Sequence, residues 1–188
     1  MAAGGGTSAG VTPRIQHPPQ SCRAYDVRMY LDALEFLEEE RDAWGPYEAL
    51  ATLTDGQLEA SVDAAHGWSG RDLMAHMLSW QGVALDVARE LAVNEESPTI
   101  ARVDAAWEAQ GGDAYNAEIQ ATWAALPMTE LRERMRTQPG ELRGYLTVVP
   151  ESRWVKHADH LRTFHDETIA HYEEHMPELE AVLLAART

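Results

Sequence analysis

Lysine and cysteine are nearly absent from this chain of 188 residues, and long apolar runs are missing altogether. Lys156 is the only lysine, so arginines supply almost all of the positive charge. The single cysteine, Cys22, excludes an intramolecular disulfide. This fits a reducing compartment, and we expect a cytoplasmic protein. No stretch approaches the roughly 18 apolar residues of a membrane-spanning helix, so we expect no membrane partner.

Positive charge of any kind is scarce. The 31 acidic residues outnumber the 15 basic ones and give a formal net charge of −16. Such a surface repels phosphate backbones, so we expect no nucleic-acid partner. The opening stretch, "MAAGGGTSAGVTPRIQHPPQS", lacks the basic region and the apolar run of a secretory signal. Its glycine, serine and proline content predicts a flexible tail over residues 1–24, followed by one domain over residues 25–188.

Signals for β-strands are also almost absent, because an alternating pattern occurs only in the short "YLTVV" at 145–149. Helical periodicity is widespread instead. It predicts a helix over 25–53, interrupted at Pro46, whose ring disrupts a continuous helix. It predicts a second helix over 69–93, in which the hydroxyl of Ser69 can cap the first free amides.

The rest of the chain continues the helical pattern with more interruptions. Residues 98–112 fit either a short helix or an ordered loop. Helical segments are predicted over 113–146, with Thr129 as a cap partway and a break or kink at Pro139. The last helix is predicted over 156–186. Four long helices joined by linkers predict an all-α fold, a four-helix bundle.

Three histidines occupy helical faces that should be apolar. His76 lies on the apolar stripe of the 69–93 helix. His171 and His175 are four residues apart and share one face of the last helix, which we expect Pro177 to kink just after His175. Burying one imidazole without a partner costs roughly 1–3 kcal/mol. A shared metal ion would satisfy all three and keep a coordination position open, whereas the alternative is three core histidines with ordinary hydrogen bonds.

Two stretches that contain these histidines resemble a known family. "GWSGRDLMAHMLSW" and "ETIAHYEEH" are similar to the helix start and the final H-x-x-x-H of the DinB/YfiT-like superfamily. That superfamily includes mycothiol-dependent maleylpyruvate isomerase-type N-terminal domains and the ClbS/DfsB group. The resemblance covers about residues 26–186. It implies a four-helix bundle in which His76, His171 and His175 hold a divalent ion such as zinc, nickel or iron.

Four neighbouring residues are further candidates for this site. Glu167, four residues before His171, can serve as a general base or an extra ligand, or can be a solvated carboxylate. Trp80 can line a pocket for substrate or cofactor, or belong to the core. Asn116 lies in "DAYNAEI", which resembles a pocket-lining helix of the ClbS/DfsB group. Asp72 fits a helix cap better than a partner of a ligand histidine.

The remaining histidines and tryptophans receive structural interpretations. We expect His157 and His160, near the start of the last helix, to be exposed. We expect Trp68 and Trp154 to pack against the helix starts beside them. No nucleophile motif or phosphate-binding glycine loop is present, so a thiol nucleophile would have to come from a cofactor.

These features predict a metalloenzyme. A divalent ion would activate a low-molecular-weight thiol or a water molecule against a small organic electrophile. The reaction would be a thiol transfer or isomerisation in the first case and a hydrolysis in the second. One alternative is a non-catalytic, self-resistance type of bundle that binds or sequesters a small molecule, with the metal structural or absent. Another is a homodimeric scaffold, because an apolar helix face can pack against a second copy.

Overall fold

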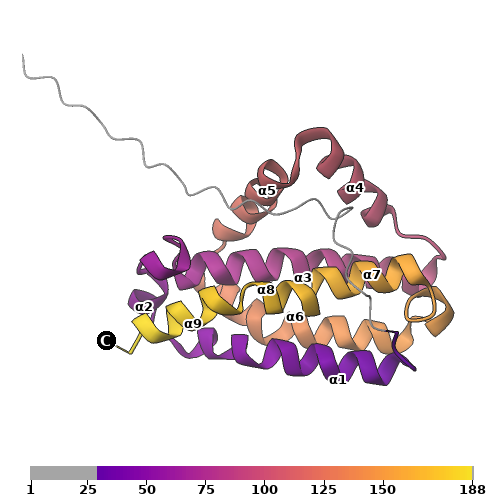
Figure 1. Ribbon diagram of the computed structural model, residues 1–188, viewed down its shortest axis with the longest axis horizontal. Coiled ribbons are helices and arrows are strands. Elements are labelled where there is room, and N and C mark those ends of the chain that lie inside the picture. The colour runs from indigo at the N-terminus through magenta and orange to yellow at the C-terminus, as the bar shows by residue number, and fades with distance from the viewer. Residues whose placement is uncertain (1–28, 188) are drawn as a thin grey trace, which may run out of the picture.

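The computed structural model describes residues 29–187, and within them the chain is helical with connecting loops (Figure 1). The predicted tail over residues 1–24, with Cys22, lies outside the described residues. The only β geometry in the described part is an isolated bridge between Ser61 and Ser69. The predicted all-α class is therefore confirmed. None of the described helices is both long and apolar enough to cross a membrane.

The helices follow one another with short connections. The first half of the described chain contains α1 (Ala33–Trp44), a 3₁₀ helix (Gly45–Thr52), α2 (Asp55–Glu59), a 3₁₀ turn (Asp63–Ala65) and α3 (Gly70–Val93). The second half contains α4 (Pro98–Gln110), α5 (Gly112–Ala124), α6 (Met128–Val148), a 3₁₀ turn (Glu151–Arg153), α7 (Ala158–Glu167), α8 (Ile169–Glu174) and α9 (Met176–Ala185). Most of the segment 98–112 thus forms the helix α4, which ends before Gly111, and "YLTVV" covers the end and the C-cap of α6 rather than a strand.

Local chemistry explains where α1 ends and where α3 begins. The α-helix stops at Trp44, and the chain continues as a 3₁₀ helix with Pro46 near its start, as the proline predicts. At α3, the amide of Asp72 donates to Ser69 Oγ at 3.1 Å, and the amide of Ser69 donates to Asp72 Oδ2 at 2.9 Å. This reciprocal capping box confirms the predicted helix start at Ser69 and the capping role of Asp72.

Other boundaries differ from the prediction. α6 continues without a break through the buried Pro139, and it begins at Met128 rather than being capped by Thr129. The last helix is divided into three, at Thr168 and at His175. Thr168 has a non-helical backbone (φ −127, ψ −93), and its hydroxyl donates to the carbonyl of Phe164 at 2.5 Å. No proline or glycine lies next to Thr168 in the sequence, so periodicity alone does not predict this break.

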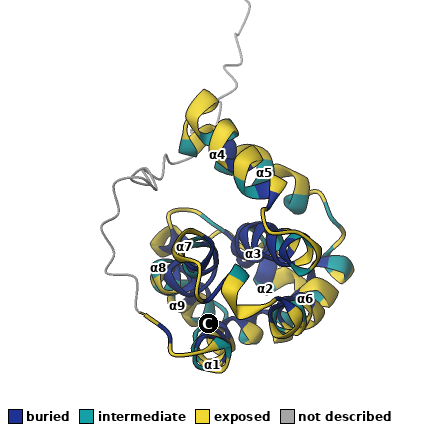
Figure 2. Cartoon of the chain, turned by 90° about the vertical axis from the view of Figure 1, so that its right-hand side faces the viewer, coloured by how far each residue is buried: buried dark blue, intermediate teal, exposed yellow. Residues whose placement is uncertain are grey.

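The helices α1, α3, α6 and the α7–α9 series lie side by side around a common interior, whereas α4 and α5 form an arm at an angle to them (Figure 1). Viewed from the end, buried residues face inward between these helices, and much of the arm is exposed (Figure 2). α3 packs against α6, α5, α4 and α7 and so occupies the centre of the arrangement. Trp154 is fully buried between Phe36 and Phe164, so it is a core residue rather than a support for a helix start.

A buried polar network crosses this interior. Arg143 Nη1 donates to Glu40 Oε2 at 2.7 Å, and the hydroxyl of Tyr172 donates to Glu40 Oε1 at 3.2 Å. Gln81 Nε2 donates to the same hydroxyl at 2.8 Å, and the hydroxyl of Tyr47 donates to the carbonyl of Tyr172 at 2.6 Å. Burial raises the pKa of Glu40, although Arg143 opposes the rise. The network ties the short helix α8 to α1, α3 and α6.

Two glycines should respond in opposite directions to replacement by alanine. A Cβ at Gly70 would lie 2.7 Å from Leu58 Cδ2 and 3.2 Å from Val182 Cγ1, whereas a Cβ at Gly144 would meet nothing within 4 Å. We expect Gly144→Ala to raise the free energy of unfolding by about 0.5–1 kcal/mol, because alanine favours the helix. Gly70→Ala should lower it by about 1–3 kcal/mol through overpacking. Urea unfolding followed by circular dichroism checks both, and a gain in stability at Gly70 would contradict the packing.

Candidate metal centre

Three imidazoles from two distant parts of the chain meet in the interior. His76 lies on α3, His171 on α8, and His175 between α8 and α9. Each offers a ring nitrogen within 4.8 Å of the others. The ring centroids form a nearly equilateral triangle with sides of 4.7, 4.8 and 4.9 Å. The structure therefore brings together the three histidines singled out by the sequence, with exposed fractions of 1, 9 and 2% for His76, His171 and His175.

The geometry of this cluster fits a first-row transition metal. His76 Nε2 and His175 Nε2 lie 3.1 Å apart. In a tetrahedral site with metal–nitrogen distances of 2.0–2.1 Å, neighbouring nitrogens are about 3.3 Å apart, so little movement is needed. Neutral imidazoles suit zinc, nickel and iron, and three protein ligands leave a coordination position for a water molecule or substrate.

Backbone breaks position two of these ligands. The helix is interrupted at Thr168, before His171, and again at His175 (φ −95, ψ 9). Pro177, near the start of α9, has no amide to continue the bonding of α8, as its position in the sequence indicated. Tyr172, adjacent to His171, anchors α8 in the buried network through both its hydroxyl and its carbonyl. The ligand-bearing segment is thus separated from regular helix on both sides and held by the core.

Glu178 of α9 lies behind His175. Its Oε2 is 3.5 Å from His175 Nδ1, and its Oε1 is 3.5 Å from Nε2 of the exposed His66. The interaction with His175 lowers the pKa of Glu178, although burial opposes it. A carboxylate beside Nδ1 favours the tautomer with its proton on Nδ1, and Nε2 then presents its lone pair to the centre. Glu178 was not predicted as a neighbour of the cluster, although its spacing of three residues from His175 was a usable signal.

Trp68 covers the cluster from the loop before α3. Its ring is stacked on His175, with centroids 5.5 Å apart and planes at 21°, and it meets His76 edge-on at 5.0 Å. The preceding residues, His66 (φ 57) and Gly67 (φ 84), have left-handed backbones that turn the chain over the site. Trp68 was predicted to pack against the start of a helix, and its contact with the imidazoles was not predicted. An indole in this position limits the access of water to one side of the centre.

Trp80 and Asn116 form a hydrogen bond beside the cluster. Trp80 Nε1 donates to Asn116 Oδ1 at 2.8 Å, which links α3 to α5. The ring of Trp80, 3% exposed, lies edge-on to His171 with centroids 6.1 Å apart. It meets Trp107 of α4 at the same centroid distance of 6.1 Å. The two predicted residues therefore lie next to each other, and their part in binding a cofactor or substrate stays a prediction.

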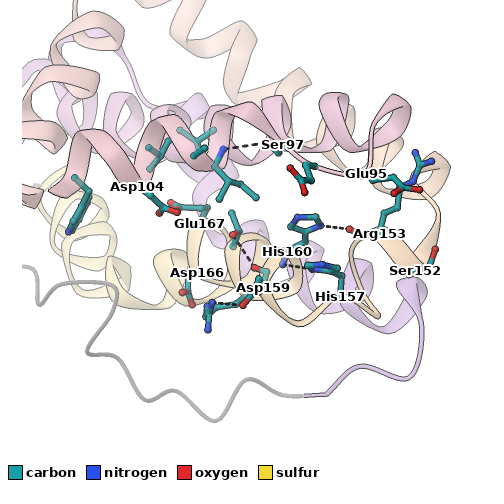
Figure 3. A pocket seen from close by; sticks show the side chains of 18 of the residues that line it. Glu95, Ser97, Asp104, Ser152, Arg153, His157, Asp159, His160, Asp166 and Glu167 are labelled. Carbon is teal, nitrogen blue, oxygen red and sulfur yellow. Dashed lines mark hydrogen bonds and ion pairs between the residues drawn. The ribbon is translucent and has the colours of Figure 1, made fainter. Parts of the chain in front are cut away.

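A cavity of about 1320 Å³ opens between α4 and α7 (Figure 3). Among the residues that line it are Val83 of α3, Trp107 of α4 and Glu167 of α7. Glu167 is 4% exposed, so it is not the solvated carboxylate of the alternative interpretation. It lies four residues before His171, and Trp107 contacts Trp80, which contacts His171. The cavity wall is thus connected to the histidine cluster in two ways: along the chain from Glu167 to His171, and through the ring contacts of Trp107 and Trp80.

His160 is buried, contrary to the expectation that it is exposed. His160 is 8% exposed, and its Nδ1 lies 2.6 Å from the carbonyl oxygen of Arg153. His157 is exposed as expected and accepts the amide of His160 at 3.4 Å, which caps α7. The two rings stack with centroids 3.9 Å apart, and both line the cavity. Helical periodicity along α7 could not predict this burial, because it depends on the contact of His160 with Arg153 outside the helix.

Acidification should reveal the interaction between Glu178 and His175. The pKa of Glu178 is lowered in the folded protein, so the stability it contributes is present above the unfolded pKa of about 4.5 and is lost as the pH falls through the lower, folded value. We expect Glu178→Gln to be less stable than the wild type at neutral pH, and the difference to close as the pH falls through this range. Urea unfolding at several pH values measures it. Glu180→Gln, at an exposed position of the same helix, should show no such convergence.

Comparison with known proteins yields no relative for this chain. No protein-family model matches it, and no curated protein or solved structure matches it at a significant level. The functional assignment therefore rests on the arrangement of the histidine cluster, its carboxylate and aromatic neighbours, and the cavity between α4 and α7.

Proposed function

We propose that this protein is a divalent-metal-dependent enzyme with the four-helix bundle of the DinB/YfiT-like superfamily. The observation that carries the proposal is the convergence of His76, His171 and His175, whose nitrogens lie within 4.8 Å of one another in the interior. Two features support it: the resemblance of "GWSGRDLMAHMLSW" and "ETIAHYEEH" to the superfamily, and a cavity whose lining includes Glu167, four residues before His171. The substrate is a small organic electrophile bound in that cavity.

Each neighbour of the cluster has a part in this proposal. His76, His171 and His175 would hold a divalent ion, which would lower the pKa of a bound water molecule or thiol and so supply hydroxide or thiolate near neutral pH. Glu178 orients His175 through Nδ1, and Trp68 shields the imidazoles from bulk water. Glu167, buried on the cavity wall, is placed to accept a proton from the attacking group or to orient the substrate. Trp80 and Asn116 fix the position of α5 beside the site.

One observation favours the second candidate, a protein that binds a small molecule without catalysis. The 3.1 Å between His76 Nε2 and His175 Nε2 is also an ordinary hydrogen-bond distance. A proton shared by these two rings satisfies both nitrogens without a metal ion. In that case the cavity between α4 and α7 is the functional part of the molecule, and the cluster is structural.

Metal content distinguishes the two candidates. We expect mass spectrometry of tag-free protein, incubated with zinc or nickel and desalted, to find about one ion per chain. His76→Ala and His171→Ala should each lose most of it, because two imidazoles bind far more weakly than three. His157→Ala, at an exposed position away from the cluster, should retain it. No ion in the wild type would refute the metalloenzyme and leave small-molecule binding.

Absorption spectroscopy of cobalt-loaded protein then distinguishes thiol transfer from hydrolysis. If the enzyme activates a thiol, addition of mycothiol, bacillithiol or glutathione should produce sulfur-to-cobalt charge-transfer absorption, because the thiolate occupies the open position. The same additions to the His171→Ala variant provide the control, since the ion is lost there. Absence of the new band with all three thiols would contradict thiol transfer and leave hydrolysis as the reaction.

A further inference from the structure

His160 presents an unused acceptor to the cavity between α4 and α7. Its Nδ1 lies 2.6 Å from the carbonyl oxygen of Arg153, and a carbonyl can only accept, so Nδ1 carries the ring proton. The other nitrogen, Nε2, is then an acceptor in the neutral ring. No group among residues 29–187 donates to it, although the residue is only 8% exposed. Figure 3 shows His160 on the α7 side of the cavity, across from Ser97.

The cavity surrounds this acceptor with negative charge. Two arginines line it, and both are engaged: Arg162 pairs with Asp159 at 2.7 Å, and Arg153 donates to the carbonyl of Leu91 at 3.2 Å. The carboxylates on the opposite side form no ion pair within the described part of the chain: Glu95, Glu96, Asp104 and Glu108. Carboxylates on both walls of a partly enclosed space reinforce one another's potential and concentrate cations there.

An aromatic face completes the lining. Trp107, half-buried on α4, borders the cavity, and the face of an indole attracts an organic cation by roughly 0.5–2 kcal/mol. Trp107 also contacts Trp80, which contacts His171. Trp80 therefore lies between Trp107 on the cavity wall and His171 of the cluster. An acceptor, a negative potential and an aromatic face all favour the same kind of ligand.

We infer that this cavity binds a small organic cation with an N–H donor, an amine or amidine, whose N–H donates to His160 Nε2 while the carboxylates balance its charge. The inference deepens the proposed function, on which it rests for the reaction, by assigning the substrate class of the enzyme. Anionic molecules of the same shape are excluded by the potential of the cavity. The histidine cluster would determine the type of reaction, and the cavity would determine the charge of the substrate that binds.

Three probes of nearly equal size and different charge test the inference. Near pH 7, tyramine is a cation, 4-ethylphenol is neutral and 4-hydroxyphenylacetate is an anion. In calorimetric titrations we expect tyramine to bind at least tenfold more tightly than 4-ethylphenol, and the anion not to bind. Added salt should weaken tyramine binding, since the cavity is open to solvent on one side. Equal or tighter binding of the neutral or anionic probe, or no binding by any of the three, would overturn the inference.

Variants locate the site. His160→Phe keeps an aromatic ring and removes the acceptor, so it should weaken tyramine binding roughly tenfold and leave 4-ethylphenol unchanged. Because this change also removes the bond to the carbonyl of Arg153, Asp104→Asn provides a second test at an exposed position, with a several-fold loss expected. The matched control is His165→Phe on the same helix, outside the cavity lining. Unchanged tyramine affinity in both His160→Phe and Asp104→Asn would refute the site.

The same titrations in His171→Ala separate this inference from the proposed function. We expect this variant to lose the metal and to keep the preference for tyramine, since the cavity groups do not include His171. If the wild type binds no metal and the charge preference persists, the enzyme proposal fails and the cation site stands. If metal binds and the charge preference is absent, the cation site fails and the enzyme proposal stands.

Discussion

The rest of the structure is arranged around the close approach of His76 and His175 in the interior. Their Nε2 atoms are 3.1 Å apart, and both residues are almost fully buried. Buried imidazoles without partners are costly, so the fold must either keep the two nitrogens facing each other or supply an ion between them. The carboxylate of Glu178 lies 3.5 Å from Nδ1 of His175, and Trp68 contacts both rings. The cluster thus joins α3 to the last helices through side chains that lie far apart in the sequence.

Holding that register requires more than the histidines themselves. Tyr172 connects the short helix α8 to three other helices through its bonds with Glu40, Gln81 and Tyr47. Burial raises the pKa of Glu40, and the ion pair and hydrogen bond with Arg143 oppose this rise, so Arg143 favours the charged form of the buried carboxylate. The geometry of this network fixes α8 between two breaks of the helix, which explains why the segment does not straighten into regular helix.

Local signals in the sequence anticipated much of this architecture and of the cluster. Ser69 and Asp72 marked the start of α3, and the spacing of His76, His171 and His175 on apolar stripes predicted that they meet. The break at Thr168 and the unbroken passage of α6 through Pro139 depend on packing between distant segments, which periodicity does not record. Two further features also depend on tertiary contacts: the burial of His160 beside Arg153 and the contact of Trp68 with the imidazoles. Sequence patterns therefore identified the three histidines and missed most of their surroundings.

The arm formed by α4 and α5 has a consequence for how such a protein can diversify. The arm lies at an angle to the other helices and packs on α3 (Figure 1), and Trp107 and Asp104 on it form part of the cavity wall. The histidine cluster belongs entirely to α3 and the last helices. Substitutions at these positions of α4 can therefore change the shape and charge of the cavity without altering the three histidines. The cavity and the cluster can thus vary independently in evolution, because different segments of the chain carry them.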